Sequence, residues 1–248
     1  TFDDITQQLT DQRRAAWSDV ARRIAHEIKN PLTPIQLAAE RLKRRYGEEI
    51  QSDRPTFIRL TDTIVRQVGD LRRIVDEFSS FARMPKPVFR AERLADIARH
   101  SLFLHEVAHP AIHFRFDSAI GEQEIICDRR QIAQALTNIV KNAVEAIEAR
   151  TATMPEPEGQ IAMEIAGRED RIVIELRDNG IGLPEERERI IEPYMTTRTK
   201  GTGLGLAIVH KIVEEHGGTM SFHDNEGGGT IVCILLDPAH LARLEEKP

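Results

Sequence analysis

Apolar residues between positions 17 and 42 recur at alternating steps of four and three, the spacing of a helix that packs against another helix. This first apolar row consists of Trp17, Ala21, Ile24, Ile28, Pro31, Ile35, Ala38 and Leu42. A second row with the same spacing consists of Phe57, Thr61, Ile64, Val68, Leu71, Val75, Phe78 and Ala82. The polar segment 47–55 between the rows predicts a turn and therefore an α-helical hairpin. Because further apolar residues widen the face of the second helix, we expect a dimer that forms a four-helix bundle.

A histidine followed at once by a carboxylate, His26 and Glu27, lies on the polar side of the first helix. Asn30 and Thr33 share its face, since they follow His26 by four and seven residues. An isolated helical histidine is most often a solvated surface residue. Pro31 counts against that interpretation, because a proline within a helix removes a backbone donor and bends the chain just beyond the pair. The pattern therefore favours a chemical site at His26.

The pattern changes after MPKPV at 84–88, where two prolines indicate a domain boundary. Beyond it we expect helices at about 91–107, 128–150 and 203–216, and strands near 111–117, 123–127, 160–166, 171–177, 219–223 and 229–236. Asp128 and Gln131 have the spacing of a capping box at the start of the second of these helices. This order of elements predicts an α+β sandwich, a sheet with helices on one face.

Three short motifs in this second part indicate a nucleotide site. They are Asn138 and Asn142 on one helix face, Asp178 before Gly180 and Gly182, and the run Gly201, Gly203 and Gly205 at a helix start. Amide oxygens suit Mg²⁺, and backbone amides at a helix N-terminus favour phosphate. Taken singly, the motifs also fit solvated asparagines, an ordinary turn or a dinucleotide-binding loop, although the P-loop ending is missing. Their joint order describes an adenine-nucleotide site better than three coincidences.

Composition narrows the classes of protein. The 248 residues carry a formal net charge of −6, which argues against a general nucleic-acid binder. Cys127 and Cys233 are too few for a disulfide scaffold or a zinc cluster, and they fit a reducing, cytoplasmic setting. No apolar run approaches the roughly 20 residues of a membrane helix, so we expect no membrane contact in this chain. Because the chain begins at Thr1, we expect a fragment, and a membrane-anchored parent stays open.

Two remaining features have ordinary explanations. His105, His109 and His113 recur every four residues, but Pro110 interrupts any helix between them. We therefore expect surface and loop histidines there rather than metal ligands. The end of the chain, ARLEEKP, is charged and is expected to be a solvated tail.

Several strings resemble, in order, the H, N, G1, F, G2 and final glycine boxes of sensor histidine kinases. They are HEIKNPLTPIQ, NIVKNAVEAI, DNGIGLP, EPYMTTRTKGTGLGLAIV and GGGTIV. The resemblance covers nearly the whole chain from about residue 11. RRIAHEIKNPLTPIQLAAERLKRRYG is most similar to the NtrY-type nitrogen-regulation sensors, and TFDDIT resembles the exit of an upstream PAS domain.

The resemblance implies a domain order and a set of partners. Residues 1–10 would be the linker from the PAS domain, 11–86 the dimerisation and histidine phosphotransfer domain, and 87–248 a catalytic domain with the Bergerat (GHKL) ATP-binding fold. ATP and Mg²⁺ would be the cofactors. The partners would be a second copy through 11–86 and the receiver domain of an NtrX-like response regulator. The full-length parent would lie in the bacterial inner membrane.

The resemblance also implies residue roles. His26 matches the phosphate acceptor and Glu27 its general base. Asn30 matches the position that orients water for dephosphorylation of the regulator. Asn142 matches the magnesium ligand, with Asn138 supporting it.

In the nucleotide boxes, Asp178 matches the residue that takes the adenine amino group, while Gly180 and Gly182 let the backbone approach the base. The phosphate loop is matched by Gly201, Thr202, Gly203, Leu204 and Gly205, with 183–202 as a mobile lid. Two departures concern this region. Tyr194 and Met195 stand where many kinases carry two phenylalanines, and Glu145 stands where some carry a lysine near the phosphates. The candidates to replace that cation are Lys141, Arg198 and Lys200.

We therefore expect a protein-histidine kinase that phosphorylates itself on His26 and passes the phosphoryl group to an aspartate of a response regulator, with phosphatase activity toward it. Two alternatives stay open. Other Bergerat-fold ATPases, such as gyrase-type, chaperone and mismatch-repair proteins, share the nucleotide boxes but lack the His-Glu hairpin. A non-catalytic dimeric scaffold would bind the regulator and only dephosphorylate it.

Overall fold

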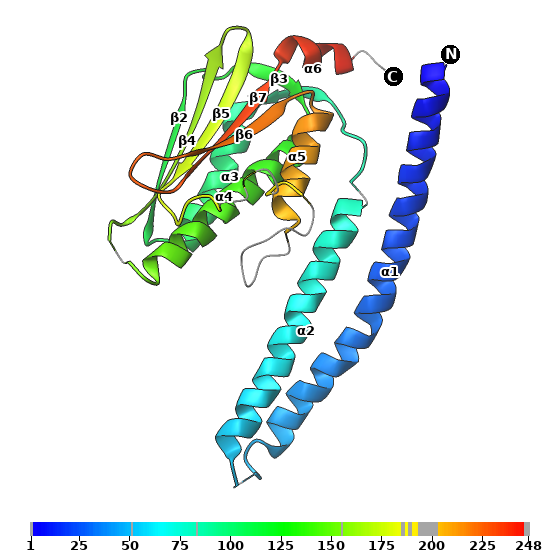
Figure 1. Cartoon of the computed structure of the whole chain (residues 1–248), viewed down its shortest axis with the longest axis vertical. Helices are drawn as coiled ribbons and strands as arrows, with labels where there is room; N and C mark the ends of the chain where they lie inside the picture. Colours follow the sequence, from blue (N-terminus) through cyan, green and yellow to red (C-terminus); the bar gives the residue numbers. More distant parts are fainter. Residues whose placement is uncertain are drawn as a thin grey trace. The chain divides into compact units, whose positions relative to one another are not determined.

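The computed structural model describes residues 2–50, 52–82, 84–154, 156–184, 187, 190–192 and 203–245. The chain forms two compact units, Thr1–Pro85 and Lys86–Pro248 (Figure 1). The first unit is an antiparallel helical hairpin of α1 (Phe2–Tyr46) and α2 (Arg54–Ala82). The turn between the helices begins where the amide of Gly47 donates to the carbonyl of Lys43 at 3.0 Å. Two ion pairs, Lys29–Asp76 and Lys43–Asp62, join the helices along their length.

Helix α1 continues through Pro31 and Pro34 without interruption. Figure 1 shows its axis changing direction partway along. A proline costs one backbone hydrogen bond and pushes the preceding turn aside, which bends a helix that packing otherwise holds together. The bend expected beside His26 is therefore accommodated within one helix.

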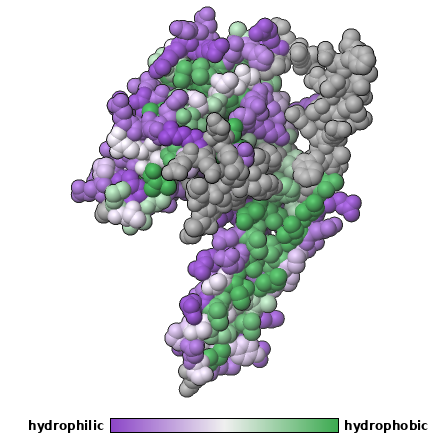
Figure 2. Space-filling model, in the orientation of Figure 1, coloured by the Kyte–Doolittle hydropathy of each residue, from purple (hydrophilic) through white to green (hydrophobic). Residues whose placement is uncertain are grey.

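A row of small and apolar side chains on α1 packs against α2. Ala25, Leu32 and Ala39 recur every seven residues and are buried, as are Val68 and Val75 on α2. The predicted first apolar row lies outside this contact, because its isoleucines and leucine are exposed. Ile24, Ile28, Ile35 and Leu42 are 42%, 41%, 46% and 45% exposed. Figure 2 shows the resulting hydrophobic band along the hairpin.

The second unit contains a five-stranded sheet of order β2-β4-β5-β7-β6. Its strands are β2 (Ile112–Ser118), β4 (Gly159–Arg168), β5 (Arg171–Asp178), β6 (Thr219–Asp224) and β7 (Thr230–Leu236). Strands β2 and β4 are parallel, and the other three pairings are antiparallel. Three helices, α3 (Leu94–Ala108), α4 (Arg129–Thr151) and α5 (Gly205–Glu215), cover one face (Figure 1). The predicted two-layer α+β sandwich is thus confirmed.

The core of this unit lies between α4 and the sheet. Apolar residues of α4 at helical spacing, such as Leu136 and Ile139, are buried. On β4 burial alternates, so that Ile161, Met163 and Ile165 point into the core. The Asp128 half of the predicted capping box is present, since its Oδ1 accepts from the amides of Arg130 at 2.9 Å and Gln131 at 3.0 Å. The amide of Asp128, which the box would pair with the Gln131 side chain, donates instead to Nε2 of His216 at 3.1 Å.

Two elements differ from the prediction. Residues 91–93, assigned to the first helix of the sandwich, belong to a short strand β1 (Arg90–Arg93) that pairs with β3 (Glu124–Cys127). The prediction also lacked α6 (Pro238–Glu245), which includes the first part of the segment ARLEEKP, where Ala242 and Arg243 are exposed. Leu241 at the middle of α6 is fully buried. The burial of Leu241 holds α6 against the rest of this unit.

Candidate functional site

The His26 side chain is exposed on α1, together with Glu27, Asn30 and Thr33. The structure therefore places all four on the solvent side of the hairpin, as their spacing predicts. Lys29, three residues after His26, forms an ion pair with Asp76 of α2, which ties this turn of α1 to its neighbour. A nucleophile presented in this way is accessible to a macromolecular partner.

The asparagine motif on α4 faces the start of α5. The Nδ2 atom of Asn138 donates to the carbonyl oxygen of Gly205, 3.4 Å away. Asn142 lies one turn later and is half-buried, like Asn138. This contact brings together two motifs that are distant in sequence. Neutral amide oxygens at this place form a donor set suited to Mg²⁺.

Asp178 ends β5 as a buried carboxylate, with only 4% of its surface exposed. Its Oδ1 atom accepts from the amide of Gly180 at 2.8 Å and from the amide of Thr230 at 3.3 Å. Two fixed donors on one oxygen hold the plane of the carboxylate. A carboxylate oriented in this way can accept a hydrogen bond from an amino group.

The loop after Asp178 packs tightly against α4. A Cβ atom on Gly180 would lie 2.6 Å from Cβ of Ala146, one turn beyond Asn142. The amide of Ile181 donates to the carbonyl of the same alanine at 3.2 Å. Gly182 has a φ of +81°, in the left-handed region that favours glycine. The aspartate and asparagine motifs therefore meet at one edge of the domain.

The glycine run leads into α5, as predicted. Gly203 has a φ of +69°, and Leu204 occupies the N-cap position as a fully buried side chain that makes no capping hydrogen bond. Helix N-terminal amides without a side-chain cap suit an anion. Several predicted residues lie outside the described part of the chain: Gly201, Thr202, Tyr194, Met195, Arg198 and Lys200.

Two polar residues that the sequence did not single out support this arrangement. Asn225, in the connection between β6 and β7, donates from Nδ2 to the carbonyl oxygen of Asp178 at 2.8 Å. His216 is fully buried at the end of α5, and its Nδ1 donates to the carbonyl of Ile212 at 2.8 Å. The position of Asn225 before three glycines is the one sequence signal that points to it.

His105, in the last turn of α3, and His109, just after it, lie close to α4, where His109 approaches Glu148 to 3.9 Å. Burial lowers the pKa of His105, and the charges of His109 and Lys141 lower it further. The rings of His105 and His109 stack at 6.0 Å, whereas His113 on β2 bonds to Glu158 at 2.8 Å. The three histidines are therefore divided between two environments. Among the helices that the structure describes, none combines the length and apolar character of a membrane span.

Two family models match the two parts of the chain separately. The family model for the His Kinase A (phospho-acceptor) domain matches residues 16–87, and the model for histidine kinase-, DNA gyrase B- and HSP90-like ATPases matches 127–240. The solved catalytic domain of histidine kinase ThkA is 30% identical, with a TM-score of 0.53, and the match covers 61% of this chain and 96% of that domain. The chain therefore belongs to the sensor histidine kinases, and its class is that of a protein-histidine kinase.

Within that family the chain is similar to nitrogen regulation protein NtrY of Azorhizobium caulinodans. The two are 54% identical, over 95% of this chain and 31% of NtrY. The chain thus spans about a third of the length of this relative. A solved complex of histidine kinase ThkA with response regulator protein TrrA matches 97% of this chain with a TM-score of 0.65 at 24% identity, which supports the fold.

Proposed function

We propose that this chain is the kinase core of a two-component sensor, in which ATP phosphorylates His26 and the phosphoryl group then passes to an aspartate of a response regulator. One observation carries the proposal. An exposed His26–Glu27 pair within a phospho-acceptor domain shares the chain with a buried carboxylate and two amides arranged for a nucleotide. The family matches assign residues 16–87 and 127–240 to these two tasks. The domain bounds that we propose are 11–86 and 87–248.

In the nucleotide site, the Asp178 carboxylate would accept a hydrogen bond from the adenine amino group. Gly180 and Gly182 would let the base approach the backbone. The phosphates would lie at the N-terminus of α5, against Thr202, Gly203, Leu204 and Gly205. Asn142, supported by Asn138, would hold Mg²⁺, which supplies charge neutralisation for the transferred group. The glycine geometry and the paired amides described above fit these ligands.

The transfer requires little covalent help from the protein. One ring nitrogen of His26 attacks the γ-phosphorus, and the bond from phosphorus to the bridging oxygen of ADP breaks. The proton on the other ring nitrogen passes to Glu27, which restores a neutral imidazole. Positioning and charge neutralisation supply most of the rate. In the phosphatase activity, Asn30 would orient the water that hydrolyses the phosphorylated aspartate of the regulator.

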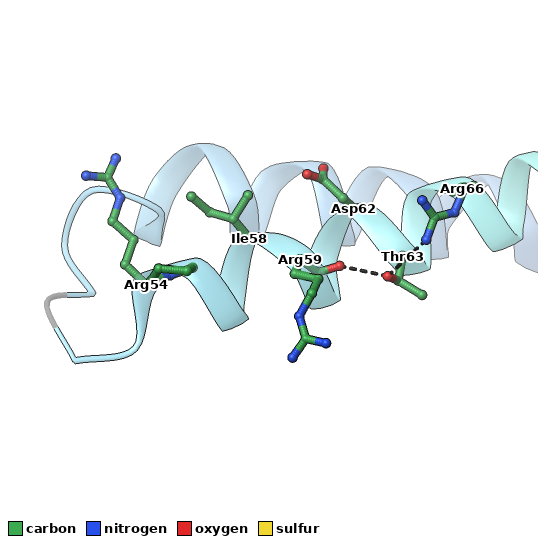
Figure 3. A pocket seen from close by; sticks show the side chains of 7 residues that line it. Arg54, Ile58, Arg59, Asp62, Thr63 and Arg66 are labelled. Carbon is green, nitrogen blue, oxygen red and sulfur yellow. Dashed lines mark hydrogen bonds between the residues drawn. The ribbon is translucent and has the colours of Figure 1, made fainter. Parts of the chain in front are cut away.

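A basic groove on α2 is our candidate docking surface for the receiver domain. The groove has a volume of about 600 Å³ and is lined by Arg54, Pro55, Ile58, Arg59, Asp62, Thr63 and Arg66 (Figure 3). Asp62 is engaged by Lys43 at 2.6 Å, so the arginines dominate the charge that the groove presents. A partner with an acidic surface would complement it. We propose an NtrX-like regulator, because the chain is similar to NtrY and the related kinase ThkA is known in complex with a response regulator.

The dimer is also a proposal, and the exposed hydrophobic row on the hairpin supports it. Ile24, Ile28 and Ile35 on α1 would join Ile64 and Leu71 on α2 in the core of a four-helix bundle. The cytoplasmic setting, the upstream PAS domain and the membrane-anchored parent stay predictions.

The test is ATP-dependent labelling of the purified chain. With γ-labelled ATP and Mg²⁺ we expect acid-labile, alkali-stable label that chases onto a response regulator. His26→Gln should abolish it, whereas His100→Gln, which changes another exposed histidine, should not. Acid-labile label on the His26→Gln variant would refute the assignment. ATP hydrolysis without any label on protein would favour the general ATPase alternative, and regulator dephosphorylation without labelling would favour the scaffold.

A further inference from the structure

We infer that Asn225 is a positioning residue for the nucleotide site, which sets the Asp178 carboxylate for the adenine amino group. The inference rests on the proposed role of Asp178 and adds a residue to it. The side-chain Nδ2 of Asn225 donates to the backbone carbonyl oxygen of Asp178 at 2.8 Å. Asn225 is distant in sequence from Asp178 and reaches it across the end of the sheet.

The bond from Asn225 lies where the pairing between β5 and β7 ends. The backbone pairing between β5 and β7 ends with Arg177 opposite Ile231, so Asp178 lies one residue beyond the ladder. At that point the connection from β6 takes over as the partner of β5. Asn225 binds the carbonyl of Asp178, and the amide of Thr230 binds its carboxylate at 3.3 Å. A side-chain donor from the connection and a main-chain donor from the start of β7 therefore fix the carbonyl and the carboxylate of Asp178.

Asn225 is itself held firmly. Its amide donates to the carbonyl of Gly229 at 3.1 Å, and its carbonyl accepts from the amide of Gly228 at 3.0 Å. Gly227, Gly228 and Gly229 have φ values of +89°, +108° and +99°, which an L residue rarely adopts. A Cβ on Gly229 would lie 2.0 Å from the carbonyl oxygen of Asp178. The three glycines thus allow the turn to approach Asp178 closely enough for the Asn225 bond to form.

Without this bond the peptide after Asp178 would keep the bond from the Asn179 amide to the carbonyl of Gln160, at 3.3 Å, but would lose its contact with the connection between β6 and β7. The loop could then shift, and with it the Gly180 amide that orients the Asp178 carboxylate. Hydrogen bonds weaken steeply when the angle at the donor departs from linearity. A modest rotation would therefore weaken the bond from the carboxylate to the adenine amino group. The catalytic step at the γ-phosphate would be unaffected once the nucleotide is bound. Asn225 should accordingly act on nucleotide affinity and on recognition of the amino group.

The variant Asn225→Asp separates this role from a general role in the turn. Asparagine and aspartate suit turns equally and have the same size, but aspartate replaces the donor by an acceptor facing the Asp178 carbonyl. We expect the KM for ATP to rise about five- to tenfold, which corresponds to the loss of one hydrogen bond. The kcat at saturating ATP should stay within about twofold of wild type. Glu226→Gln, an exposed neighbour in the same turn, should leave both constants unchanged.

The decisive measurement compares the Kd of ADP with that of the purine nucleoside diphosphate that lacks the 6-amino group. Wild type should prefer ADP, and both Asp178→Asn and Asn225→Asp should reduce that preference while the second nucleotide still binds. Retained binding of that nucleotide shows that each variant is folded. If Asp178→Asn keeps the preference for ADP, the proposed role of Asp178 is wrong and this inference fails with it. If Asp178→Asn loses the preference and Asn225→Asp keeps it, the inference for Asn225 alone is overturned.

Discussion

The buried imidazole of His216 accepts a hydrogen bond from the backbone amide of Asp128, with 3.1 Å between Nε2 and N. The bond joins the end of α5, which begins at Gly205, to the start of α4, which carries Asn138 and Asn142. Because Nδ1 donates to Ile212 and Nε2 accepts from Asp128, the neutral ring is held in one tautomer. Burial lowers the pKa of His216 from its ordinary value of 6.5, more than its neighbours raise it.

This bond predicts a loss of stability in mild acid. Below about pH 6.5 the unfolded chain takes up a proton on this imidazole that the folded chain refuses until a lower pH. The stability is therefore full above pH 6.5 and falls as the pH drops toward the lowered pKa. In His216→Gln the thermal midpoint at pH 7.5 should be lower, since an unmatched buried group costs about 1–3 kcal/mol. Between pH 7.5 and 5.5 the thermal midpoint of His216→Gln should fall less than that of wild type.

The measurement is thermal unfolding followed by circular dichroism at both pH values. The pKa of His105 is also lowered, so protonation of His105 contributes a fall in stability of the same sign. His105→Gln therefore provides the matched variant against which the pH dependence of His216→Gln is compared. An equal drop in wild type and His216→Gln would contradict the prediction.

The close approach of Gly180 to α4 predicts that this position tolerates no side chain. In Gly180→Ala the new Cβ would meet Ala146 at 2.6 Å, so the loop must move away from α4. We expect destabilisation by about 1–3 kcal/mol together with weaker nucleotide binding. Gly167→Ala is the control, because its Cβ would lie 3.9 Å from the nearest atom, a methyl carbon of Ile120. Titration with a fluorescent ADP analogue checks the prediction, and wild-type affinity in Gly180→Ala would refute it.

The exposed apolar row on the hairpin predicts a dimer that a single charge can break. Leu71 on α2 is 47% exposed, and Leu71→Lys would place a charge in the proposed bundle core. Sedimentation should show wild type as a dimer and this variant as a monomer at micromolar concentration. Gly69→Lys adds the same charge on the opposite side of the same helix, where a new Cβ would meet nothing within 4 Å, and should stay dimeric. A dimeric Leu71→Lys variant would place the interface elsewhere.

The basic groove on α2 predicts a charge-reversal effect limited to phosphotransfer. Arg59→Glu should leave labelling of His26 unchanged and slow transfer to the receiver domain about tenfold or more, with the wild-type rate falling as salt increases. Arg72→Glu, on the same helix but outside the groove lining, is the control. Rapid-quench transfer assays measure the difference. Equal transfer rates in the two variants would remove the groove from the docking surface.

Local rules accounted for the elements that place the site. The strand predicted near 171–177 corresponds to β5, which presents Asp178, and Asp128 correctly fixed the start of α4. Periodicity alone did not separate the two apolar faces of α1. Ala25 is buried against α2, whereas Ile24 is exposed, and the row predicted from the heptads contains Ile24 but not Ala25. Both faces repeat every seven residues, because a helix that packs against its own hairpin partner and one that packs against a second copy need the same spacing.

The remaining differences come from contacts that are distant in sequence. Strand β1 is short and polar, and it forms only because β3 supplies its partner. Helix α6 is held by the burial of Leu241 against the rest of the unit, a contact that the sequence of the helix does not reveal. Asn225 reaches Asp178 through a single side-chain bond that leaves no periodic trace. Each of these features requires knowledge of which segments meet in space.

The Asp128 carboxylate serves three backbone amides at once, those of Arg130 and Gln131 in α4 and that of Val88, 2.8 Å from Oδ2. Val88 lies just inside the second unit, close to where the chain leaves the hairpin. Because one side chain protects all three amides, their exchange with deuterated solvent should slow or quicken as a group. The rate of amide exchange at Val88 therefore reports how firmly the first turn of α4 is held, and it can be measured on the unmodified chain.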